Sequence, residues 1–98
     1  MSRQPVDARN AAETIALRAL AFLASDSERL GRFLALTGIG PDELRTKARE
    51  PRMLAGVLDH LMGDETLLLV FATDTGLKPE AIASAYFILA GPPPEQSI

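Results

Sequence analysis

The chain has 98 residues, of which 47% are hydrophobic, and a formal net charge of −3 at pH 7. This length fits one domain with a single core, and the acidic balance argues against a protein that grips nucleic acid over its whole surface. The chain contains no cysteine, which excludes disulfides, thiolate metal sites and cysteine nucleophiles. No apolar run reaches the roughly 20 residues of a membrane span, and residues 1–6 lack the apolar region of a secretory signal. We therefore expect a cytoplasmic protein that does not associate with membranes.

Three helices are predicted in the first half of the chain. Asp7 is placed to cap a helix that runs to about Ala24, and Asp26 is placed to cap a second helix that ends at Gly38. Pro41 then opens a third helix, because a proline at the first helical position gives up no hydrogen bond. One face of the second helix is marked by residues at helical spacing: Leu30, Phe33, Leu34 and Thr37.

Three more helices are predicted in the second half. Pro51 opens a helix that ends at Gly63, and Pro79 opens another that ends at Gly91. Between them, residues 65–75 form a helix capped by Asp64. Within it, the apolar run 67–71 is also compatible with a buried strand on periodicity alone.

An internal repeat favours a helix for that run. A shift of 38 residues aligns 16–50 with 54–88 without gaps, and the matches fall on caps, apolar helix faces and a Thr-Gly-x-x-Pro turn. Eight positions are identical: Leu20/Leu58, Leu23/Leu61, Asp26/Asp64, Leu30/Leu68, Phe33/Phe71, Thr37/Thr75, Gly38/Gly76 and Pro41/Pro79. The sequence therefore predicts an all-α fold in which two tandem three-helix units pack around one core.

The domain organisation follows from this repeat. The single domain is expected at 7–91, with units at about 8–49 and 51–91, a frayed segment at 1–6 and a mobile, proline-rich tail at 92–98. In the fifth helix, three apolar residues replace Arg29, Gly31 and Arg32 of the first unit. A helix that is apolar nearly all round is expected to be central and buried.

The Thr-Gly-x-x-Pro turns and the segment "LMGDETLLLVFA" carry a resemblance over about residues 10–90. Here the chain resembles a family of small alphaproteobacterial proteins known as a domain of unknown function. The resemblance implies a helical fold and no activity that can be carried over.

Few residues suggest chemistry. The single histidine, His60, precedes Asp64 by one helical turn, a spacing that a metal site or a general base can use. We favour a surface histidine near a helix end, because Asp64 is needed as a cap. No nucleophile motif or phosphate-binding loop is present, so we expect a non-enzymatic protein with no catalytic residue, cofactor or metal.

Two surfaces are candidates for binding. Ile15, Leu17 and Phe22 lie beside or beyond the repeated apolar stripe of the first helix, so they are candidates for contact with a protein partner, either a second copy or another chain. Burial within the monomer is the other interpretation. The sequence thus favours a helical interaction or adaptor module that forms a homodimer.

The alternative is a nucleic-acid-associated protein that resembles a helix-turn-helix. Its contact residues would be Arg45, Lys47, Arg49 and Arg52, which follow the first Thr-Gly-x-x-Pro turn. The second unit lacks such a cluster, so nucleic acid is the less favoured partner. Ion pairs from Arg49 and Arg52 to neighbouring carboxylates would weaken this alternative further.

Overall fold

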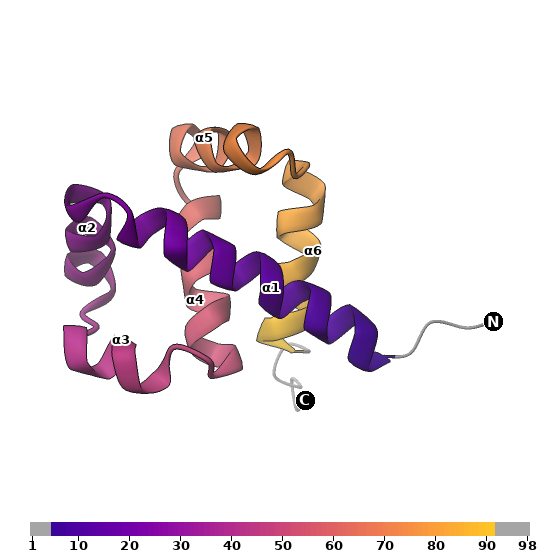
Figure 1. The fold of residues 1–98 in the computed structure, drawn as a ribbon, viewed down its shortest axis with the longest axis horizontal. Helices are drawn as coiled ribbons and strands as arrows, with labels where there is room; N and C mark the ends of the chain where they lie inside the picture. Colours follow the sequence, from indigo (N-terminus) through magenta and orange to yellow (C-terminus); the bar gives the residue numbers. More distant parts are fainter. Residues whose placement is uncertain (1–4, 92–98) are drawn as a thin grey trace, which may run out of the picture.

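The computed structural model describes residues 5–91 as six α-helices, with no strand in that range (Figure 1). The helices are α1 (Pro5–Ala24), α2 (Ser27–Thr37), α3 (Pro41–Lys47), α4 (Pro51–Met62), α5 (Glu65–Thr75) and α6 (Pro79–Ala90). The predicted all-α class is therefore confirmed, and the 67–71 run is helical. Of the ends predicted to be frayed or mobile, residues 1–4 and 92–98 lie outside the described residues.

The second helix of each predicted unit starts in the same way. The Asp26 carboxylate accepts hydrogen bonds from the backbone N–H groups of Glu28 at 2.9 Å and Arg29 at 3.3 Å, and the Asp64 carboxylate accepts one from Leu67 at 3.1 Å. These bonds satisfy N–H groups that have no partner inside the helix. Both predicted caps are thus confirmed.

The same two helices also end alike. Gly38 has φ 76° and ψ 8°, and Gly76 has φ 76° and ψ 7°, a left-handed conformation that glycine adopts without a Cβ clash. One residue earlier, the Thr37 hydroxyl donates to a carbonyl of its own helix at 2.7 Å, and the Thr75 hydroxyl does so at 2.8 Å. Each predicted turn is therefore made by the same local hydrogen bonds.

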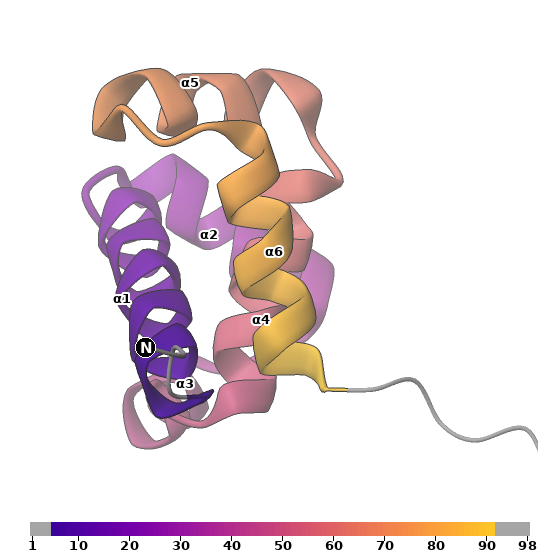
Figure 2. The same cartoon turned by 90° about the vertical axis from the view of Figure 1, so that its right-hand side faces the viewer.

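The core lies where α1, α4 and α6 pack against one another. Figure 1 shows α1 crossing in front of α4 and α6, and Figure 2 shows α4 and α6 side by side. The largest fully buried side chains are those of Phe33, Phe71, Leu23, Leu54, Leu58, Leu61, Ile82 and Val57. Half of them come from α4, which is therefore the central helix, while α2 and α5 each contribute one phenylalanine from the periphery.

Two predictions about individual helices are wrong. Helix α1 begins at Pro5, and Asp7 lies in its first turn instead of capping it; an acidic residue is also favourable there because of the helix dipole. Helix α5 is peripheral and not central, with Leu69 49% and Val70 41% exposed. An apolar sequence on all faces of a helix does not determine which faces find a neighbour.

Aromatic contacts connect the two predicted units crosswise. The Phe33 ring of α2 lies with its centroid 5.1 Å from that of His60 in α4, and the Phe71 ring of α5 lies 5.3 Å from that of Phe22 in α1. Each residue of one pair is 38 positions from a residue of the other pair. The buried phenylalanine of each peripheral helix thus contacts a side chain from the first helix of the other unit, as expected if two equivalent units share one core. The equivalence of all three helices stays a prediction.

Candidate functional site

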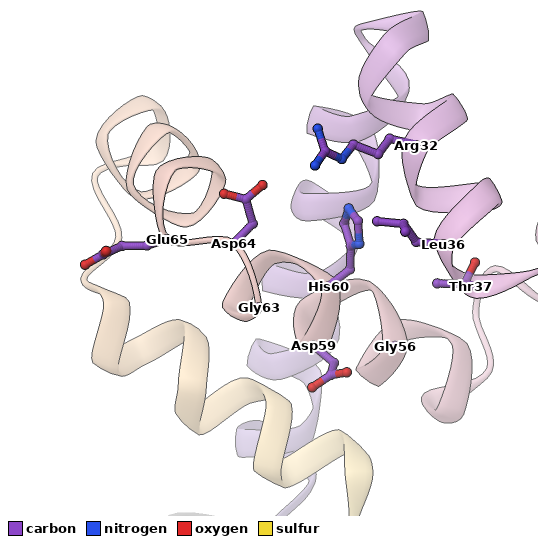
Figure 3. Close-up of a pocket in the computed structure, with 9 residues that line it drawn as sticks. All are labelled: Arg32, Leu36, Thr37, Gly56, Asp59, His60, Gly63, Asp64 and Glu65. Atoms are coloured by element: carbon purple, nitrogen blue, oxygen red, sulfur yellow. The ribbon is translucent and has the colours of Figure 1, made fainter.

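A surface groove of about 610 Å³ runs between α2, α4 and the start of α5, and we call it the α2–α4 groove (Figure 3). Its lining combines both charges with apolar and backbone surface: Arg32, Leu36, Thr37, Gly56, Asp59, His60, Gly63, Asp64 and Glu65. The groove has a smaller counterpart of about 340 Å³ between α1 and α5, lined by Arg18, Ala21, Phe22, Ser25, Asp74 and Thr75. All six counterpart residues stand 38 positions from residues of the α2–α4 groove.

The two grooves differ in what lines them. Gly56 and Gly63 stand where the smaller groove has Arg18 and Ser25, which leaves more space in the α2–α4 groove. A Cβ built on Gly56 would meet no atom within 4 Å, so packing inside the protein does not require a glycine there. His60 takes the place of Phe22 at the base of the groove.

His60 lies in the last turn of α4 and is half-buried. Its ring meets Phe33 nearly edge to face, with an interplanar angle of 75°, and its side chain points toward Arg32 and Leu36 of α2 (Figure 3). Burial lowers the pKa of His60 below 6.5, and the positive charge of Arg32 also lowers it, whereas Asp64 and Asp59 act in the opposite direction. The imidazole is therefore mostly uncharged at neutral pH.

The acidic residues around His60 do not gather on its ring. Asp64 is engaged as the cap of α5, and Figure 3 shows Asp59 directed away from the imidazole. Within residues 5–91 no group of three or more His, Asp or Glu side chains is placed to hold a metal ion. What the groove offers is one neutral imidazole and one guanidinium beside an exposed leucine, a surface suited to polar contact.

The predicted partner residues of α1 lie inward. Phe22 is only 9% exposed, because it packs against Phe71 and its ring lies under the Arg29 guanidinium, whose carbon is 4.4 Å from the ring centroid. Ile15 and Leu17 are partly buried against the core. The other interpretation, burial within the monomer, accounts for Phe22, which is therefore not available to a partner as predicted.

The predicted basic residues are all exposed, on α3 and around the start of α4. Arg45 forms an ion pair with Asp42, and the Lys47 Nζ lies 3.9 Å from a Glu43 carboxylate oxygen. Within the described part of the chain, Arg49 and Arg52 have no carboxylate oxygen within 4.0 Å. The two arginines that could have weakened the nucleic-acid alternative by pairing thus do not do so.

The exposed apolar surface is elsewhere than predicted. Large apolar side chains are exposed on α2, α5 and α6: Leu36, Leu69, Val70, Phe87 and Ile88. On α5, a shallow hollow of about 470 Å³ is lined by Thr66, Leu69, Val70, Thr73 and Asp74. The sequence signal for this exposed surface is the replacement of Gly31 and Arg32 by Leu69 and Val70. From the sequence alone, the same replacement predicts burial.

The chain was compared with family sequence models, curated proteins and solved structures. The sequence model of a family described as "Protein of unknown function (DUF3572)" matches residues 9–92, which is most of the chain. No curated protein and no solved structure matches it. No helix of residues 5–91 combines the length and apolar character needed to cross a bilayer.

Proposed function

The chain belongs to the DUF3572 family of proteins of unknown function, and we propose that it is a non-enzymatic helical interaction module that associates with a second copy of itself. The contact surface in this proposal is the outward face of α5, formed by Thr66, Leu69, Val70 and Thr73, which we call the α5 stripe. We also propose that the protein is cytoplasmic and of alphaproteobacterial origin, as expected from the sequence.

The comparison of α5 with α2 is the observation that carries the proposal. Leu69 and Val70 of α5 occupy the positions that Gly31 and Arg32 occupy in α2. Both helices have the same caps and the same buried phenylalanine, so the fold does not demand apolar side chains there. Exposed apolar residues that folding does not require often mark an association surface.

The α5 stripe is suited to a two-fold partner. Its order is Thr, Leu, Val, Thr at spacings of three, one and three, so it reads threonine–apolar–apolar–threonine from either end. Two antiparallel copies of α5 would therefore place apolar centre against apolar centre, as a self-complementary contact requires. Glu65 and Asp74 are nine residues apart, which puts them on opposite sides of the helix, and Asp74 borders the hollow at one edge of the stripe.

The expected dimer is weak. One helix pair buries less than the roughly 1,200 Å² of total surface typical of stable, specific complexes. We therefore expect a monomer–dimer equilibrium that depends on protein concentration, with dimer accumulating only at high concentration.

Sedimentation equilibrium across a wide concentration range tests the proposal. The wild-type protein should show a rising average mass, and Val70→Arg, which copies the residue of α2, should stay monomeric. Leu36→Lys removes an even more exposed leucine from α2 and should dimerise as the wild type does. A wild type that stays monomeric at high concentration, or a Val70→Arg protein that dimerises normally, contradicts the proposal.

The nucleic-acid role is the second candidate, and the exposed, unpaired Arg49 and Arg52 support it within the described residues. Titration of labelled duplex DNA at about 50 and 200 mM salt tests it, because phosphate contacts weaken steeply with salt. Tight, salt-dependent binding that is lost in Arg49→Glu/Arg52→Glu would support it. Absence of binding at the lower salt concentration would contradict it.

A further inference from the structure

We call the segment formed by α2 and α3, residues 27–47, the α2–α3 arm. Four of its apolar side chains pack against the core but are only partly buried: Leu30, Leu34, Ile39 and Leu44. Phe33 is the one buried residue of α2, and α3 has none. In Figure 1 the arm lies to one side of α1, α4 and α6, which pack together as the core. The attachment of the arm therefore depends heavily on the surroundings of Phe33.

One of the groups that Phe33 meets is the imidazole of His60, with ring centroids 5.1 Å apart. The equivalent contact, between Phe71 of α5 and Phe22 of α1, joins two phenylalanines that cannot take up a proton. The protein thus carries two matched attachments, of which one contains a titratable ring. His60 is the single histidine of the chain.

We infer that His60 makes the attachment of the α2–α3 arm to α4 sensitive to pH in the range of about 5 to 8, in which histidine changes charge. When the arm is closed, Phe33 and the groove keep part of the imidazole from water. When the arm opens, the imidazole is hydrated again. Protonation therefore favours the open arm, because burial beside Phe33 takes away part of the water that solvates a charged ring.

The charged groups around His60 influence whether its imidazole is protonated. Arg32, Arg29 and Glu28 belong to α2 and line the hollow that contains the ring, Asp64 is the cap of α5, and Asp59 is on α4 itself. Asp64 and Asp59 favour the protonated ring, whereas Arg32 opposes it.

Burial is the largest influence, and the pKa of His60 in the closed protein is lower than its ordinary value of 6.5. The open arm therefore binds more protons than the closed arm. The closed state has its full stability above about pH 6.5, and this stability is lost as the pH falls through 6.5 toward the lowered pKa.

Hydrogen exchange on the full chain tests the inference. Protection factors of the α2 and α5 amides should be measured at pH 7.5 and 5.5 and corrected for the intrinsic effect of pH on exchange. In the wild type, α2 should lose several-fold more protection than α5 on acidification. A ring-proton titration by NMR should place the His60 midpoint below 6.5.

Three variants make the test specific. His60→Phe copies the Phe22–Phe71 contact, and His60→Asn keeps a polar group that does not titrate. In either variant that folds, the protection of α2 should become as independent of pH as that of α5. Phe22→His should transfer the sensitivity to α5. Parallel changes in α2 and α5 of the wild type, or a pH-dependent α2 in both His60 variants, would overturn the inference. Because no step depends on dimerisation, a monomeric wild type would leave the inference intact.

Discussion

The two halves of the molecule share their first and second helices but not the role of the third. Helix α2 matches α5 in its caps and the turn that follows, and the contact of α2 with α4 has its counterpart in the contact of α5 with α1. Helix α6, however, is built into the core through Ile82, Ala85 and Leu89, whereas α3 has no buried residue. Similar local sequence thus gives the same local structure in both halves. The halves differ because α6 packs into the shared core and α3 does not.

The largest expected effect follows from this inequality. Ile82→Ala should lower the free energy of unfolding by about 2–4 kcal/mol, because Ile82 is fully buried and truncation leaves a cavity. Leu44→Ala, the equivalent change in α3, should cost under about 1 kcal/mol, since Leu44 is only partly buried. Urea unfolding of both variants gives the comparison, and equal losses would show that α3 and α6 are equally integrated.

The matched turns should respond equally. Gly38→Ala and Gly76→Ala each place a Cβ at φ 76°, so each should cost about 1 kcal/mol. The effect is backbone strain alone, because a Cβ at either position meets no atom within 4 Å. Thermal or urea unfolding measures both. Losses that differ by more than the experimental error would mean that the two turns are not equivalent.

The smallest expected effect concerns the ion pairs of α3. Arg45→Ala removes the pair with Asp42, whose side chains are both highly exposed. Such pairs contribute under about 1 kcal/mol, so the midpoint of unfolding should barely move. Arg52→Ala is the control, because Arg52 has no carboxylate oxygen within 4.0 Å among the described residues. A clear destabilisation by Arg45→Ala alone would show that α3 depends on this pair.

The sequence was sufficient for the parts of the fold that short-range chemistry determines. Asp26, Asp64, Gly38 and Gly76 mark helix ends because each satisfies a local backbone requirement, and the structure confirms all four. The position of α5 could not be derived in this way. Its apolar faces are compatible with burial in the core or against another chain, and only the packing of α1 and α6 around α4 decides between them.

The candidate site was predictable only in part. His60 was noticed as the single histidine, but its contact with Phe33 joins two helices and leaves no trace in local spacing. Phe22 lies beside or beyond the repeated apolar stripe of its helix, yet it and its counterpart His60 each contact a phenylalanine from the other unit. The repeat shows which positions of the two units are equivalent, but it does not show which side chains are in contact.

The crosswise aromatic packing is the central claim, and nuclear Overhauser effects between assigned ring protons test it most directly. We predict cross-peaks between Phe33 and His60 and between Phe22 and Phe71, because both pairs of ring centroids lie within 5.3 Å. Cross-peaks from Phe33 to Phe22 in place of His60 would show that each peripheral helix packs within its own unit, and would contradict the account.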